Sequence, residues 1–298
     1  MRAMVGLALN GWLFGMPVVL MTWAALRLLH RAPARVRYVL AIVAFLAATA
    51  MPLIPRDAHL AVAEGSAVET VADAIAFPLT MLWAIGAAVL LTRETIGHLR
   101  LRGFREEAPA ELRRWLDWPA RIPLGVSDHT PPQTIGLLAP RVVLPRDIAA
   151  TFPRAVVRRI ARHELAHCRW RDPFVYALLR IVASVFWLWP VWPLLRWARR
   201  EREVAADEFA LRSASGDEES YVAALLQLAH AHRSPAPAMA ANDLEFRARG
   251  ILGMPRRSSV ALSAAVLALA STLIAIARPV RAEPDEPIVA IRIVKEIQ

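Results

Sequence analysis

Three apolar segments in the first third of the chain limit what it can fold into. Residues 4–29, 38–54 and 74–91 are almost free of charged side chains, and a fourth apolar segment follows at residues 260–277. A helix needs roughly 20 apolar residues to cross a bilayer, so the first segment is long enough and the second a little short. The sequence therefore predicts a mainly α-helical integral membrane protein.

The composition supports this interpretation. Of the 298 residues 56% are hydrophobic, and ten are tryptophan, which is typical of membrane proteins. The net charge of +10 is carried almost entirely by arginine, because Lys295 is the one lysine. The arginines flank the apolar segments, where the positive-inside rule explains them, so we expect no direct nucleic-acid binding. A single cysteine, Cys168, excludes an internal disulfide.

The distribution of charge predicts the orientation. Basic residues follow the first apolar segment (30–37) and the third (93–105), whereas the stretch between the second and third (55–73) is mildly acidic. The positive-inside rule then places the N-terminus outside and residue 93 onward in the cytosol. We expect a multi-pass protein of a bacterial-type plasma membrane.

The motif His163-Glu164-Leu165-Ala166-His167 carries the chemistry. Residues four apart lie on one helical face, so His163 and His167 can bind one metal ion, and Val156 and Ile160 share that packed face. Glu164 is placed to take a proton from a metal-activated water, as in zinc hydrolases. We therefore predict a zinc ion and a catalytic role for Glu164.

A third ligand is available 36 residues after His167. Glu203 and Asp207 are again four residues apart, so one helix would present both carboxylates. Two histidines and one glutamate form a known catalytic zinc set, in which Glu203 would bind the metal. Asp207 would then hydrogen-bond the far nitrogen of a ligating histidine and fix its tautomer. The alternative is a charged helix surface. For the oxyanion of the tetrahedral intermediate, Tyr221, His230 and His232 stay open as candidates.

Together these residues resemble a known family. The zinc motif, Arg171-Asp172, the aromatic block at residues 186–190, the Glu203/Asp207 pair and the segment 134–145 resemble the BlaR/MecR-type membrane zinc metallopeptidases. Ala206 departs from the family, which commonly has Cys there. The resemblance implies a gluzincin-like fold and a signalling protease that acts on a protein or peptide, such as a cytoplasmic DNA-binding repressor.

Members of that family carry a penicillin-binding sensor, which we do not expect here. Its acylation site needs Ser-x-x-Lys, and Arg292 lies three residues before the one lysine. We therefore expect no direct β-lactam sensing by this chain. The rival to the protease hypothesis is a non-proteolytic membrane sensor or scaffold with a structural zinc site. Glu164 argues against that rival, because a structural site has no use for an uncoordinated carboxylate beside its first ligand.

The expected organisation has four parts. Residues 1–92 form three transmembrane helices, 93–257 a small α+β gluzincin-like metalloprotease domain at the cytosolic face, 258–278 a fourth transmembrane helix and 279–298 an extracytoplasmic tail. Residues 121–127 and 134–144 should form a small sheet, with the second strand at an edge because Pro140 and Pro145 lack N–H donors. That edge would bind an extended peptide or be covered structurally.

Residues 181–195, between the two ligand segments, should enter the membrane and return to the same side. They are too short for two crossings, and a single crossing would separate the histidines from Glu203. The tryptophans nearby suit the bilayer interface, where the ring is buried and the N–H stays wet. These are Trp187, Trp189, Trp192 and Trp197. The alternative is a hydrophobic core element of the catalytic domain.

Overall fold

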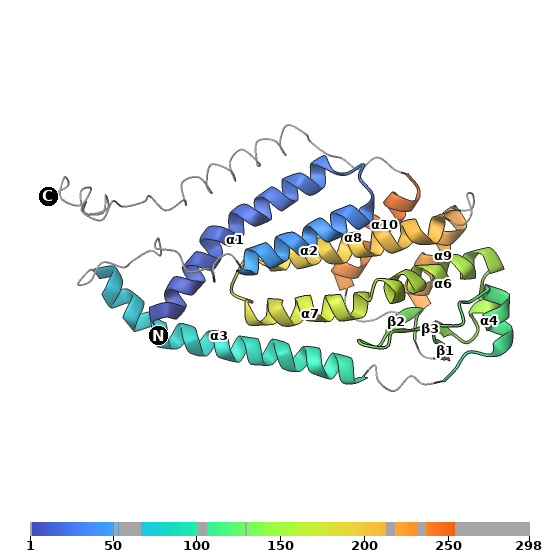
Figure 1. Ribbon diagram of the computed structural model, residues 1–298, viewed down its shortest axis with the longest axis horizontal. Coiled ribbons are helices and arrows are strands. Elements are labelled where there is room, and N and C mark those ends of the chain that lie inside the picture. Colours follow the sequence, from blue (N-terminus) through green and yellow to red (C-terminus); the bar gives the residue numbers. More distant parts are fainter. Residues whose placement is uncertain are drawn as a thin grey trace.

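The computed structural model describes residues 2–50, 53, 67–100, 106–128, 130–212, 218–231 and 237–253. This part of the chain is mostly helical and contains one small sheet (Figure 1). The predicted fourth apolar segment, 260–277, and the tail after it lie outside the described residues, so both stay predictions.

Three long helices form the N-terminal part: α1 Arg2–Leu28, α2 Ala34–Ala50 and α3 Ala67–Arg100. They are rich in alanine and leucine, which are among the strongest helix formers. Two contain a stretch that is long and apolar enough to cross a membrane, Leu7–Leu28 and Ala74–Gly97. With 17 residues, α2 lies at the lower limit of roughly 17–25 residues for a span.

The helix α2 has one buried and one exposed apolar face. Its buried residues recur at helical spacing and pack against α1 and α8; they are Tyr38, Ala41, Phe45 and Ala48. The exposed face is also apolar, with about half of each side chain accessible at Val36, Val39, Val43 and Leu46. Because the exposed face of α2 is as apolar as its buried face, it is suited to contact something other than water.

The segment between the two ligand-bearing motifs forms a helical hairpin. α7 (Asp172–Val185) runs away from the metal motif, the chain turns over residues 186–191, and α8 (Trp192–Leu211) returns (Figure 1). The turn is fixed from both sides: Trp12 of α1 donates its indole N–H to the Leu188 carbonyl at 2.9 Å, and Trp83 of α3 donates to the Val185 carbonyl at 2.7 Å. The chain therefore doubles back between the two ligand-bearing motifs, whereas the entry of this segment into a membrane and its return to the same side stay predictions.

The tryptophans of the hairpin are packed more closely than expected. The indole N–H groups of Trp187 and Trp192 donate to the carbonyls of Trp83 and Trp187, and Trp189 is 4% exposed. A Cβ at Gly11 would lie 2.2 Å from the Trp189 ring, so only glycine lets α1 approach so closely. The expectation of wet indole N–H groups was wrong for Trp187 and Trp192, because protein carbonyls accept their hydrogen bonds.

The sheet has three strands: β1 (Leu124–Ser127), β2 (Gln133–Ile135) and β3 (Arg141–Pro145), in the order β1-β3-β2. β3 is parallel to β1 and antiparallel to β2. The second predicted strand is thus two strands, separated by a turn in which Gly136 has a φ of 91°. The edge prediction is right for β2 and wrong for β3. Pro145 is tolerated in the central strand because it is the last residue, and Arg146 donates its N–H to Ser127 instead.

The helix α6 (Arg154–Arg169) lies against the sheet and carries the metal motif (Figure 1). It begins after Pro153, which has extended ψ and no side-chain cap. The predicted packed face is confirmed, since Val156 and Ile160 are 1% and 3% exposed in a core shared with β1, β3 and the short helix α5 (Ile148–Thr151). Burial of each such side chain contributes about 1.5–3 kcal/mol.

The remaining helices pack on the two helices that carry the ligands. α4 (Ala110–Leu116) packs on α6, and α9 (Glu218–Ala231) and α10 (Pro237–Ile251) pack on α6 and α8 respectively. α9 contributes the fully buried Tyr221, and α10 contributes Arg247. Both residues contact Asp207 of α8.

Candidate metal centre

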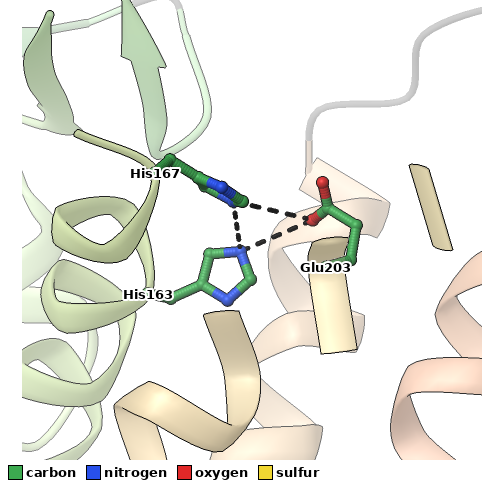
Figure 2. Close-up of side chains that lie close together, drawn as sticks. All are labelled: His163, His167 and Glu203. Carbon is green, nitrogen blue, oxygen red and sulfur yellow. Dashed lines mark hydrogen bonds and ion pairs between the residues drawn. The ribbon is translucent and has the colours of Figure 1, made fainter. Parts of the chain in front are cut away.

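Two helices bring three donor side chains together. His163 and His167 of α6 are buried, at 5% and 7% exposure, and face Glu203 of α8 (Figure 2). The Nε2 atoms of the two histidines lie 3.2 Å apart. The Glu203 Oε2 atom lies 3.5 Å from Nε2 of His163 and 4.0 Å from Nε2 of His167. Among the described residues, His163, His167 and Glu203 form a group whose ligand atoms lie close enough together to hold one metal ion.

The donor set fits zinc. A tetrahedral zinc ion with bonds of about 2.0–2.1 Å holds its ligand atoms about 3.3–3.4 Å apart. Two of the separations observed here, 3.2 and 3.5 Å, lie near that value, and the third is longer at 4.0 Å. Two imidazoles and one carboxylate leave the fourth tetrahedral position free, as in catalytic zinc sites. The sequence-predicted ligands therefore meet in the structure; their binding of zinc stays a prediction.

Asp207 lies where the sequence predicted, behind His163. Its Oδ1 atom is 2.8 Å from Nδ1 of His163, so Nε2 is the ring nitrogen that faces His167 and Glu203. Asp207 is itself held by Tyr221, whose hydroxyl donates at 3.0 Å, and by both nitrogens of the Arg247 fork at 2.8 Å. Burial would raise the pKa of Asp207, but the charges of Arg247 and His163 outweigh it and hold this pKa well below its usual value.

A second carboxylate, Asp172, lies behind His167 as Asp207 lies behind His163. The sequence reasoning had not given Asp172 this role. Its Oδ2 atom lies 2.8 Å from Nδ1 of His167, and its Oδ1 atom accepts a hydrogen bond from Tyr38 of α2 at 3.2 Å. Arg171 has a φ of 53°, a left-handed turn that separates α6 from α7 and places Asp172 at the first position of α7. The available signal was an acidic residue five positions after the second histidine.

Glu203 presents one oxygen to the histidines and the other to Arg202. The Arg202 Nη2 atom donates to Oε1 at 2.6 Å, which leaves Oε2 on the metal side. Burial opposes ionisation of Glu203, but the charge of Arg202 and the hydrogen bond from His163 keep its pKa well below the usual value. For His163, burial opposes protonation, and the Asp207 carboxylate outweighs this and raises the pKa to about 9. The site is therefore built to hold positive charge.

Glu164 is not part of the donor cluster and faces a cavity. Its Oε2 atom lies 2.9 Å from the hydroxyl of Thr134, and its backbone carbonyl lies 2.8 Å from the same hydroxyl. Thr134 belongs to the edge strand β2, so this contact fixes the distance between the strand and the metal motif. The cavity has a volume of about 1280 Å³, and both metal-side residues and β2 line it, among them Glu164, His167, Glu203, Thr134 and Ile135.

Two of the three candidates for an oxyanion stabiliser, Tyr221 and His230, do not line this cavity. The Tyr221 hydroxyl is fully buried and donates to Asp207. His230 is exposed, and its Nδ1 atom lies 3.1 Å from a carbonyl of its own helix. His232 lies outside the described residues. Tyr176 and Arg202 do line the cavity, and sequence reasoning had not selected them.

The described chain is thus a mostly helical protein with a small mixed sheet, two helices long and apolar enough to cross a membrane, and a possible His-His-Glu metal site. The family described as BlaR1 peptidase M56 matches residues 12–250, and the chain belongs to this family. The regulatory protein BlaR1 of Bacillus licheniformis is 32% identical over 83 residues. That match covers 28% of this chain and 14% of the relative. The predicted family resemblance is confirmed.

Proposed function

We propose that the chain is a membrane-embedded zinc endopeptidase whose active site faces the cytosol. One observation carries the proposal: a two-histidine, one-carboxylate donor set opens on the same cavity as an uncoordinated glutamate and the edge of a strand. Membership of a peptidase family supports it. A structural metal site would explain the donors but not Glu164, whose carboxylate is oriented by Thr134 toward the cavity.

The residues divide the chemistry between them. His163, His167 and Glu203 would hold zinc, which supplies Lewis acidity that polarises the scissile carbonyl and lowers the pKa of water. Asp207 and Asp172 keep the histidine protons on Nδ1, so that both Nε2 atoms stay available as donors. Glu164 takes the proton from the attacking water and returns it to the leaving amine.

The strand β2 would hold the substrate. It pairs with β3 on one side, and among the described residues no strand pairs with its other side. Residues 132–139, which include β2 and the turn after it, line the cavity. An extended peptide can add to such an edge through backbone hydrogen bonds. This arrangement would place its scissile bond beside Glu164, because Thr134 of β2 contacts that residue directly.

The N-terminal helices would lie in the membrane. In α3, only 11% of the apolar stretch Ala74–Gly97 is buried in the protein, so its side chains need an apolar surrounding. Exposed apolar side chains recur along α1, α2 and α3, for example Leu13, Val43 and Ile85. The basic residues that follow the first and third apolar segments support a topology with the N-terminus outside and the metal centre at the cytosolic face.

Membership of a peptidase family supports a protein substrate. The relative named a regulatory protein suggests that cleavage serves regulation, and we propose a cytoplasmic DNA-binding repressor as the substrate. The test compares cells that express the wild type with cells that express Glu164→Gln, and measures which cytosolic proteins lose intact length. Metal analysis of the purified protein should give one zinc per wild-type chain and marked loss in His167→Ala. Equal zinc in both, or no protein cleaved by the wild type alone, would contradict the proposal.

A further inference from the structure

Two neighbouring residues of α2 contact carboxylates that flank the two halves of the metal centre. The Tyr38 hydroxyl donates to Oδ1 of Asp172 at 3.2 Å, and Oδ2 of the same carboxylate lies 2.8 Å from His167 of α6. The preceding residue, Arg37, forms an ion pair with Glu201 of α8 at 2.7 Å, and Glu201 lies two residues before Glu203. A helix of the N-terminal part is therefore joined to the histidine side and to the carboxylate side of the site.

The contact through Asp172 determines how His167 is oriented. Asp172 is 1% exposed and Tyr38 is 3% exposed, so water cannot replace either hydrogen bond. A carboxylate held at both oxygens has a fixed plane, and that plane fixes the ring of the histidine to which it is bonded. Without the Tyr38 hydroxyl, Oδ1 would be a buried acceptor without this donor, and the carboxylate would be free to rotate.

The ion pair of Arg37 fixes the position of α2. The side chains of Arg37 and Glu201 are 2% and 9% exposed, and Arg37 also donates to the His30 carbonyl at 3.2 Å. Breaking a buried pair of this kind leaves an uncompensated charge, so α2 and α8 keep one register. The Tyr38 hydroxyl is thereby held in a fixed position beside Asp172. The Tyr38 side chain is buried in one cluster with Ala41 and Ala198.

We propose that Tyr38 is a positioning residue of the metal centre, which acts through Asp172 on His167, and that α2 thereby controls the site. A displacement of α2 relative to α7 removes the hydrogen bond to Asp172 and loosens the orientation of His167. Metal affinity and turnover then both fall. The effect on turnover rests on the proposed peptidase function, whereas the effect on metal affinity does not. This coupling would let a signal that moves the N-terminal helices reach the catalytic residues.

The test uses the full chain in detergent micelles and four variants: Tyr38→Phe, Asp172→Asn, the double variant, and Thr49→Val as the matched control. Thr49 is also a buried hydroxyl of α2, but it donates within its own helix, to the Phe45 carbonyl at 3.0 Å. Zinc affinity is measured by competition with a chromogenic chelator, and the kcat and KM of peptide cleavage are measured separately. The unfolding midpoint of each metal-free variant reports on stability alone.

Asp172→Asn should weaken zinc binding by about 10–100-fold, as the loss of a partner behind a ligand does. Tyr38→Phe should weaken zinc binding by about threefold to tenfold, because the Tyr38 hydroxyl contacts Asp172 and not His167 itself. It should also lower kcat with KM unchanged. The double variant should match Asp172→Asn, since both changes act along one path. Thr49→Val should bind zinc and cleave peptide like the wild type.

Two results would overturn the inference. Zinc affinity of Tyr38→Phe within twofold of the wild type would show that the hydroxyl does not position His167. Independent, multiplying effects of Tyr38→Phe and Asp172→Asn would show that the tyrosine does not act through the aspartate. A wild type that binds zinc but cleaves no peptide would contradict the proposed function alone, since the zinc affinities of the variants would still decide this inference.

Discussion

Arg247 offers the sharpest test of how the metal centre is supported. It lies on α10, and its guanidinium forms two hydrogen bonds of 2.8 Å with Asp207, the carboxylate behind His163. The two side chains are 16% and 3% exposed. Two positions further along the same helix, Arg249 pairs with Glu245 in water, with side chains 58% and 60% exposed. The same replacement by methionine at the two arginines thus compares a buried with an exposed ion pair.

The expected difference follows from burial. Removing one partner of a buried pair typically destabilises a protein by about 3–5 kcal/mol, because the other charge remains without compensation. An exposed pair contributes about 0–1 kcal/mol. In Arg247→Met, the Tyr221 hydroxyl and His163 still contact Asp207, so we expect the lower end, about 3 kcal/mol. For Arg249→Met we expect less than about 1 kcal/mol.

The pH dependence of this difference has a definite sign. Arg247 holds the pKa of Asp207 below its usual value, so the ion pair stabilises the protein at any pH above the aspartate's unfolded pKa of about 3.9. This stabilisation is lost as the pH falls through the lowered pKa of the folded state. The wild type and Arg247→Met should therefore differ most near neutral pH and converge in acid.

The assay is denaturant unfolding of the metal-free protein in one detergent, followed by helical circular dichroism. Arg247→Lys is a useful third variant, because an ammonium keeps the charge but cannot form the two-pronged contact, and it should fall between the wild type and Arg247→Met. If Arg247→Met and Arg249→Met lower the free energy of unfolding by the same amount, within about 1 kcal/mol, burial of the ion pair does not strengthen its support of Asp207.

Three further predictions follow from the site and the hairpin. Glu164→Gln should lower kcat for peptide cleavage by at least about 10²–10⁴-fold and leave the zinc content unchanged; cleavage at the wild-type rate would remove Glu164 from its role as general base. Asp207→Asn should weaken zinc binding or activity by about 10–100-fold, measured by chelator competition, and no effect would return Asp207 to a purely structural role. Cysteines introduced at Phe174 and Arg199 in a Cys168→Ser background should both react with an impermeant thiol reagent from the cytosolic side only, and labelling from opposite sides would exclude a shared metal site.

The ligands themselves could be predicted because their spacing is a local property. Positions four apart share a helical face wherever the helix lies, so the pair of His163 and His167 and the pair of Glu203 and Asp207 follow from the sequence. Whether the two pairs meet depends on the tertiary packing of their helices. The contact could still be expected, because a catalytic zinc ion needs a third protein ligand. The structure brings the carboxylates of one pair to within 2.8–4.0 Å of the histidine nitrogens of the other.

The supporting residues could not be predicted because they come from distant elements. Tyr38 and Thr134 reach the motif across 134 and 30 residues of sequence, and Arg247 lies 40 residues after its partner. A tyrosine, a threonine and an arginine carry no spacing signal, since packing alone decides what they contact. The sheet shows the same limit: Pro140 and Pro145 marked the whole segment 134–144 as an edge strand, which holds for β2, but they could not tell that Pro145 ends a central strand.

The dimensions of the hairpin connect the metal centre to the proposed membrane. The helix α7 has 14 residues, which at about 1.5 Å per residue span about 21 Å, less than the hydrocarbon thickness of about 30 Å. Its turn is held by Trp12 and Trp83, which belong to the two helices long and apolar enough to cross a membrane. If α1 and α3 span the bilayer with the metal centre at its cytosolic face, the turn must lie inside the hydrocarbon layer without reaching the far side. The backbone carbonyls of that turn then need donors within the protein, and the two indole N–H groups supply them at Leu188 and Val185. Replacing Trp83 with phenylalanine should therefore destabilise the hairpin more than its loss of volume accounts for.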